Sequence, residues 1–296
     1  MRHLFHSLGR RALILLTITY LLILLVVPNL YLLWQAFHPG WQIFQHSITA
    51  QYALAALKNT GIVVIISLLI TVPFGLVTAI ILVRDKFFGR KFLDGLVDLP
   101  FAAPAAIGAF ALMAVYGPRG LLGPILVSHG IKIIFALPGM ILATVFVTLP
   151  FVVREVVPLL EEIGTEPDDA AHTLGASQWQ TLAWVTLPSL RAGILHGISL
   201  SYARALGEFG AILLISGNIL GVTQTMPIYI YDSYIDFQMD AAYAGAAVLI
   251  ALSIFGRGLL ALWERPTTLE IAQERPWGGV RQANRARRWE RRQAAG

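Results

Sequence analysis

The stretch GIVVIISLLITVPFGLVTAIILV, residues 61–83, decides the fold class, because none of its side chains is charged. A helix rises about 1.5 Å per residue, so this run is long enough to cross the roughly 30 Å hydrocarbon core of a bilayer. Runs of similar apolar character recur at 12–34, 96–115, 133–153, 192–216 and 241–263. We therefore predict an all-α integral membrane protein with six transmembrane helices.

Composition agrees with a membrane location. Of the 296 residues, 56% are hydrophobic and 13% are charged, whereas water-soluble domains carry about a quarter charged residues. The sequence lacks the strict apolar and polar alternation that marks the strands of an outer-membrane barrel. The surface of the folded chain is therefore expected to face lipid.

Three of these runs contain prolines or follow basic residues, which bears on whether each one is a transmembrane helix. The run at 96–115 contains Pro100 and Pro104, and the run at 133–153 also contains prolines, which membrane helices tolerate where neighbours satisfy the freed backbone groups. The first run follows Arg10 and Arg11, as the apolar segment of a secretory signal does. It is too long for such a segment and lacks a small-residue cleavage site, so we predict a retained anchor helix.

The positions of Lys and Arg predict the orientation, because short cytoplasmic loops are enriched in both residues. The positive charges occur before the first run and at alternate links after it. They are Arg2, Arg10, Arg11, Arg84, Lys86, Arg90, Lys91, Arg154 and Arg191. The other links are poor in positive charge and are expected to face outward with Lys58, Arg119 and Asp232. Both termini are then cytoplasmic.

The same pattern divides the chain into three parts. Residues 1–52 form an N-terminal cytoplasmic segment and anchor helix, residues 53–263 a membrane core with a cytoplasmic loop at about 160–190, and residues 264–296 a basic cytoplasmic tail. The tail is expected to lie on anionic lipid. Because the net charge of +5 comes largely from this tail, and the basic and aromatic interleaving that stacks bases is absent, nucleic acid is not an expected partner.

Residue content excludes several kinds of chemistry. The chain has no cysteine, which excludes disulfides, thiolate metal sites and cysteine nucleophiles. The seven histidines are scattered, so no metal site is predicted. No G-x-x-x-x-G-K-[ST] phosphate loop occurs, so any nucleotide has to be bound by a separate chain.

The loop at about 160–190 carries the most specific pattern in the sequence. Its residues of interest are Glu161, Glu162, Glu166, Asp168, Asp169, Ala170, Ala171, Gly175, Val185, Leu187 and Pro188. Two consecutive small residues let a partner approach closely, Gly175 can end a short helix in a left-handed conformation, and Pro188 favours a second break. We predict a helix, turn, helix docking element; an ordinary interhelical loop is the alternative.

This pattern resembles the cytoplasmic signature of the permease subunits of ATP-binding cassette (ABC) importers. That signature reads Glu-Ala-Ala, three residues, Gly, nine residues, Ile, one residue, Leu-Pro, and the spacing is intact here, with Asp169 and Val185 as conservative departures. The resemblance implies a type I importer permease fold. It also implies a coupling loop, seated in a cleft of an ATPase subunit, that contains Asp169, Ala170, Ala171, Gly175, Leu187 and Pro188.

The run at 192–216 holds two ionisable residues, Arg204 and Glu208. Counted from Arg191, Arg204 lies roughly 20 Å along a helix and so within the bilayer, where ionisable groups are costly and often functional. Their separation of four places both side chains on one face, where they can neutralise each other. Two interpretations stay open: a structural ion pair that joins helices, or an anion-attracting arginine beside the pathway, restrained by the glutamate.

The expected substrate class also comes from resemblance. Residues 98–101 and 129–158, which include FALPGM at 135–140 and FVTLPF at 146–151, are similar to sulfate and thiosulfate permeases of the W type. Residues 204–210, 216–218 and 223–227 are similar in style to molybdate and tungstate permeases. The resemblance implies import of sulfate, with thiosulfate as a further substrate and a molybdate or tungstate importer as the alternative.

The resemblance further implies an assembly in the bacterial cytoplasmic (inner) membrane. Its other members would be two ATPase subunits that hold ATP and Mg, a second permease that is homologous or identical, and an extracytoplasmic anion-binding protein. This chain would bind no cofactor and catalyse no reaction itself.

Two other classes of function are alternatives for a polytopic membrane protein. A secondary transporter driven by an ion gradient would usually show internal repeats and intramembrane carboxylates for ion coupling, and neither is clear in the sequence. A membrane-embedded enzyme would need a cluster of nucleophile, base or metal ligands at one depth, and Arg204 with Glu208 is the only such pair.

Overall fold

The computed structural model describes the backbone of residues 2–263 and the side chains at residue 10 and from residue 13 onward. The basic tail at 264–296 lies outside these residues, and so does its predicted contact with lipid. Every element in the described part is helical, which confirms the all-α class.

Six stretches match the six predicted spans. Four helical stretches are long and apolar enough to cross a membrane: Leu13–Phe37, α4 (Gln51–Arg84), α8 (Leu137–Ile163) and α15 (Met239–Trp263). The number is six when each of two bent pairs is counted as one span: α5 (Arg90–Ala102) with α6 (Ala105–Tyr116), and α12 (Arg191–Leu206) with α13 (Gly210–Ser216).

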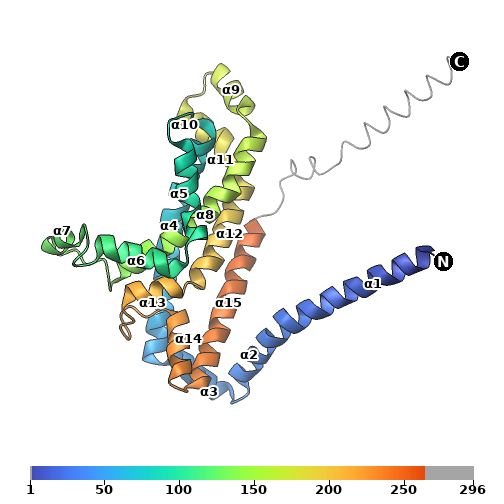
Figure 1. The fold of residues 1–296 in the computed structure, drawn as a ribbon, viewed down its shortest axis with the longest axis vertical. Helices are drawn as coiled ribbons and strands as arrows, with labels where there is room; N and C mark the ends of the chain where they lie inside the picture. The colour runs from blue at the N-terminus through green and yellow to red at the C-terminus, as the bar shows by residue number, and fades with distance from the viewer. Residues whose placement is uncertain (1, 264–296) are drawn as a thin grey trace.

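The centre of the molecule is a packed bundle of α4, α8 and α12 (Figure 1). A Cβ atom on Gly75 of α4 would lie 2.8 Å from Val152 Cβ of α8, and one on Gly197 of α12 would lie 3.0 Å from Val152 Cα. Glycine at both places therefore lets three helix backbones approach closely, as is common between membrane helices. Thr71 and Thr148 add a buried hydroxyl–hydroxyl hydrogen bond of 3.0 Å between α4 and α8.

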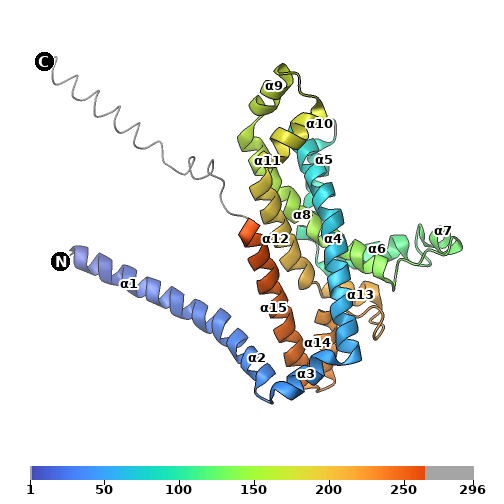
Figure 2. The same cartoon turned by 180° about the vertical axis from the view of Figure 1, so that it is seen from behind.

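The N-terminal helices form an arm that leaves the bundle at α3 (Figure 2). The arm consists of α1 (Arg2–Leu21), a π-helical turn η1 (Leu22–Val26) and α2 (Val27–Phe37). A proline at residue 28 follows η1, and its missing N–H explains why the helix widens there. The end of α2 and α3 (Trp41–Thr49) pack on α15 through Ala36, Phe44 and Ala247, whereas the apolar surface of the arm's span is unburied.

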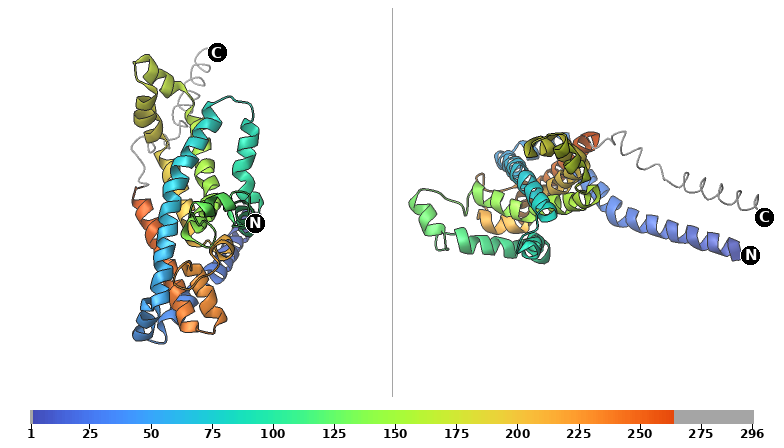
Figure 3. Two further views of the ribbon diagram at one scale, coloured as in Figure 1. Left: turned by 90° about the vertical axis from the view of Figure 1, so that its left-hand side faces the viewer. Right: turned by 90° about the horizontal axis from the view of Figure 1, so that it is seen from above.

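The third predicted span is not straight. Its two halves, α5 and α6, meet at 116°, and α6 with α7 (Gly123–Ser128) extends sideways from the bundle (Figure 3). Ala103 at the break has φ −104° and ψ 133°, because the ring of Pro104 disfavours helical backbone at the preceding residue. Pro104, which causes the bend, is visible in the sequence, whereas the angle is known only from the structure.

Several short helices lie at the two ends of the long axis (Figure 1). One end carries α9 (Glu166–Thr173), α10 (Gln178–Thr181), a second π-helical turn η2 (Leu182–Thr186) and α11 (Leu187–Ser189). The opposite end carries α3 and α14 (Met226–Ile235). The loop predicted to dock a partner therefore lies at one extremity of the molecule.

Candidate functional site

The predicted docking loop, called here the coupling segment (residues 164–190), begins with a short helix that has a defined end. Gly164 breaks the chain from α8 with φ +68°, and α9 follows. After α9, the Ala176 N–H donates to Ala171 O and the Gly175 N–H donates to His172 O, both at 3.0 Å. This is the Schellman arrangement, and Gly175 has the φ of +89° that it requires. The predicted left-handed role of Gly175 is confirmed.

The second half of the coupling segment is also fixed by local chemistry. Ser177 and Gln180 form a reciprocal capping box at the start of α10. The π-helical turn η2 ends two residues before Pro188, which lacks an N–H for the preceding turn. The predicted helix, turn, helix unit is therefore observed, with Pro188 at its second break.

The signature residues divide by exposure. Asp169, Ala170, Gly175 and Pro188 are exposed, and Ala171 and Leu187 are half-buried. Three large apolar side chains of the segment also face outward: Leu174 is 89% exposed, Trp179 79% and Trp184 80%. Such a surface is typical of a site that a partner covers.

One acidic residue of the segment turns inward. Asp168 Oδ2 lies 2.9 Å from Arg84 Nη2, at the end of α4. Its other oxygen, Oδ1, accepts a hydrogen bond of 3.1 Å from Thr186 Oγ1 in η2. Asp168 therefore joins α4, α9 and η2, three elements that are separate in sequence.

Arg204 and Glu208 meet as their spacing predicted. Arg204 Nη1 lies 2.8 Å from Glu208 Oε2; the Glu208 side chain is 1% exposed and that of Arg204 36%. Glu208 Oε1 also accepts a 2.9 Å hydrogen bond from the Ala211 N–H, in the first turn of α13. Because α12 and α13 meet at 57° at this point, Glu208 holds the two halves of a broken helix together. This supports the structural interpretation, and both interpretations remain compatible with the geometry.

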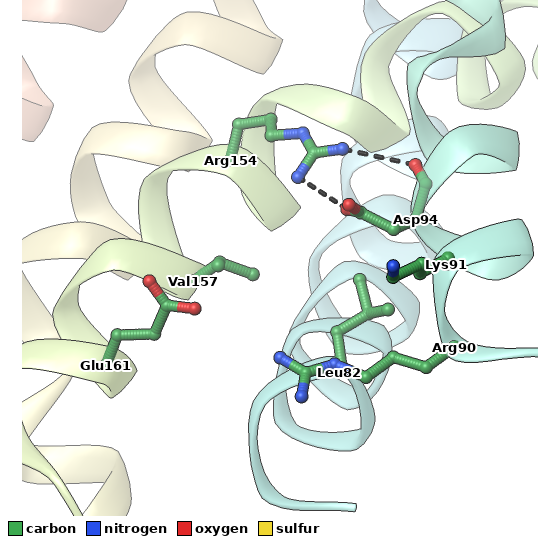
Figure 4. A pocket seen from close by; sticks show the side chains of 7 residues that line it. All are labelled: Leu82, Arg90, Lys91, Asp94, Arg154, Val157 and Glu161. Carbon is green, nitrogen blue, oxygen red and sulfur yellow. Dashed lines mark hydrogen bonds and ion pairs between the residues drawn. The ribbon is translucent and has the colours of Figure 1, made fainter. Parts of the chain in front are cut away.

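A second arginine cluster was not foreseen as a site. Arg154 of α8 contacts two carboxylates of α5 at 2.7 Å each, Asp94 Oδ1 and Asp98 Oδ2. It borders a cavity of about 450 Å³, whose other wall carries Arg90 and Lys91 of α5 (Figure 4). The sequence signal was present: two aspartates four residues apart on one helix repel each other unless a cation lies between them.

The segment similar in style to molybdate permeases forms a rigid turn at the end opposite the coupling segment. Asn218 Nδ2 and Gln224 Nε2 donate to the same oxygen of Asp232, at 2.8 and 2.7 Å. Asn59 of α4 donates to the carbonyl oxygens of Val222 and Gln224 at 3.0 Å. The polar residues of 216–227 are thus used to hold the turn.

Comparison with known proteins places the chain in a family. Residues 71–267 match the family described as "binding-protein-dependent transport system inner membrane component". The chain is 41% identical over 255 residues to the sulfate transport system permease protein CysW of Synechocystis sp., covering 86% of this chain and 92% of the relative. It is 38% identical to CysW of Escherichia coli K12, covering 78% and 79%, and 37% identical to CysT of the same organism, covering 80% and 86%.

The fold agrees with solved transporters. A chain of a bacterial ABC transporter that imports the acidic polysaccharide alginate superposes with a TM-score of 0.74 at 22% identity, covering 90% of this chain and 99% of that one. At this identity the match speaks for the fold, a type I importer permease fold as predicted. The chain belongs to the binding-protein-dependent transport system inner membrane component family, whose members are transport permeases.

Proposed function

We propose that this chain is the membrane-spanning permease subunit of an ATP-driven ABC importer that carries sulfate across the bacterial cytoplasmic membrane. The observation that carries the proposal is the identity of 41% to a sulfate permease along 92% of that protein's length. The intact coupling segment supports the same conclusion, because its exposed signature residues and apolar side chains suit contact with a motor subunit.

The proposed assembly supplies what this chain lacks. Two ATPase subunits hold ATP and Mg and bind the coupling segments through Ala170, Leu174 and Trp179, which are exposed in the isolated chain. A second permease completes the passage. Similarity to both CysW and CysT of one organism supports a homologous rather than an identical second subunit. A solved alginate transporter in complex with a periplasmic protein supports an external anion-binding protein.

The proposed orientation places both termini in the cytoplasm. Arg191 Nη2 donates to Trp263 O at 3.1 Å, which puts the end of α15 beside the start of α12 and the coupling segment. The arm runs from its N-terminus toward α3, at the opposite end (Figure 1). Since an ATPase binds from the cytoplasm, we infer that the end of α15 and the start of the arm lie on its side.

Cysteine labelling tests this orientation cleanly, because the natural chain has no cysteine. We expect an impermeant thiol reagent to label an Arg119→Cys variant from outside the cell and a Glu162→Cys variant only after the membrane is opened. Both residues are exposed. The reverse pattern would overturn the topology.

Transport in proteoliposomes tests the substrate. Vesicles that contain both permeases, the ATPase and the cognate binding protein should accumulate labelled sulfate only with ATP, and thiosulfate should compete strongly and molybdate weakly. Efficient molybdate uptake without sulfate uptake would reject the substrate and favour the molybdate alternative suggested by residues 216–227. Failure of the ATPase to copurify in mild detergent would reject the importer itself.

A further inference from the structure

The acidic residues of the coupling segment do not behave alike. Glu166 and Asp169 are exposed, and an exposed carboxylate on a short helix gains little from staying in one place. Asp168 is different, because its side chain is 20% exposed and that of its partner Arg84 is 15% exposed. The sequence pattern does not distinguish these acidic residues, whereas in the structure Asp168 makes a specific contact.

Both oxygens of Asp168 are used, and each contacts a different element. Oδ2 pairs with Arg84 at the last residue of α4. Oδ1 accepts from Thr186, which is 8% exposed and lies in η2 on the far side of the segment. The carboxylate of Asp168 in α9 thus contacts both η2, in the second half of the coupling segment, and α4, a helix of the membrane core.

Arg84 depends on this contact. Its Nε and Nη2 atoms are almost fully covered and make no hydrogen bond of regular geometry among the described residues, and Asp168 is the one carboxylate recorded there within ion-pair distance of the guanidinium. A buried arginine without its carboxylate is strongly disfavoured. The two side chains therefore stay together when the segment moves, unless the surrounding packing opens.

The coupling segment has two chain connections, and one of them is a glycine. It joins α8 through Gly164, whose φ of +68° is open to glycine, and it returns to α12 through Leu190. Leu190 lies in the same buried cluster as Leu82 of α4, and the Arg84–Asp168 pair adds a polar attachment to that helix. It also connects α9 to α4, a helix of 34 residues that spans about 50 Å and packs along both α8 and α12.

We propose that the Arg84–Asp168 pair is a positioning contact that transmits movement of the coupling segment to α4, and so couples ATP hydrolysis to transport. This rests on the proposed function, in which an ATPase grips the exposed face of the segment. Asp168 itself does not contact the ATPase in this account. Removal of the pair should leave ATPase binding intact and lower the amount of sulfate moved per ATP.

The first experiment compares Asp168→Asn with Glu166→Gln in the reconstituted complex. Both changes remove one negative charge from α9, but Glu166 is exposed and has no recorded ion pair among the described residues. We expect the ratio of sulfate uptake to ATP hydrolysis to fall roughly two- to thirtyfold in Asp168→Asn, the range seen for mutations in coupling networks, and to stay unchanged in Glu166→Gln. An unchanged ratio in Asp168→Asn would overturn the proposal.

A cross-link covers the case in which Asp168→Asn does not assemble. In a chain without natural cysteines, Arg84→Cys with Asp168→Cys can be joined by a short bifunctional thiol reagent. If the two residues move together, the cross-linked complex should transport better than the same variant before cross-linking. Loss of transport on cross-linking would show that the two ends must separate, which contradicts the proposal.

The same samples separate failure of this proposal from failure of the proposed function. If the ATPase does not copurify with the unmodified chain, the importer assignment is rejected. If it copurifies equally with the unmodified chain and with Asp168→Asn, and the ratio of uptake to hydrolysis does not change, only the positioning contact is rejected.

Discussion

Arg204 with Glu208 and Arg154 with Asp94 and Asp98 use the same chemistry in two different settings. In the first, an arginine and a carboxylate four residues apart neutralise each other across a helix break. In the second, two carboxylates four residues apart share one helix and an arginine from another helix lies between them. Identical spacing therefore produces a local pair in one region and a link between helices in the other.

Burial makes the two regions differ in energy as well. Glu208 is 1% exposed, whereas Asp94 and Asp98 are 50% and 51% exposed. Charge interactions are strong where water is excluded and weak where it is present. The difference shows that counting ion pairs says little about stability until the exposure of each partner is known.

The largest effect is expected at the buried pair. Arg204→Ala leaves the Glu208 charge without its partner, and breaking a buried pair costs about 3–5 kcal/mol; we expect the low end, about 3 kcal/mol, because Arg204 is 36% exposed. The double variant Arg204→Ala with Glu208→Gln removes both charges, and the amide oxygen introduced at position 208 can still accept the hydrogen bond from the Ala211 N–H. The double variant should therefore be more stable than the single one.

Expression level, sulfate uptake and the apparent melting temperature of the complex in detergent would be measured for the two single variants and the double variant. Recovery in the double variant supports a structural pair. If uptake instead falls additively while the melting temperature recovers, Arg204 has a separate role beside the pathway, and the comparison with Arg154 would no longer be one between two structural contacts.

These two regions also show how far the sequence could predict the structure. The four-residue spacing of Arg204 and Glu208 predicted their contact, although α12 ends at Leu206 and Glu208 lies in the break before α13. Gly175 was predictable for a similar reason, since a Schellman end needs one left-handed residue. The bend at Pro104 had a visible cause, but its angle of 116° depends on how α6 packs against α8 and α13.

Contacts between distant segments were not predictable from one sequence. The sequence favours a topology role for Arg84 and Arg154, because the enrichment of arginine in cytoplasmic loops is enough to explain their presence. Only the arrangement of α9 beside the end of α4 shows that Arg84 pairs with Asp168, and only that of α5 beside α8 shows that Arg154 pairs with Asp94. Local sequence patterns thus predict the helices and their breaks. The contacts between the helices are known only from the three-dimensional structure.

The smallest effect is expected at Arg154. Its loss removes two half-exposed pairs, and exposed pairs are worth about 0–1 kcal/mol, so Arg154→Ala should cost about 1 kcal/mol in low salt. Salt screens charges over about 10 Å at 0.1 M and about 3 Å at 1 M. The fall in apparent melting temperature should therefore become smaller when NaCl is raised from about 0.1 to about 1 M. The fall caused by Arg204→Ala should not change with salt.

Adding Asp98→Asn to Arg154→Ala isolates the repulsion that Arg154 relieves. Like charges four residues apart on a helix destabilise it by about 0.2–0.5 kcal/mol, so the double variant should recover part of the loss in low salt and none in high salt. A loss that stays the same in both salt conditions would mean that Arg154 acts through packing of its side chain and its 3.1 Å hydrogen bond to Asp94 O. In that case exposure would no longer explain the difference between the two arginine clusters, and the depth of each in the membrane would have to explain it.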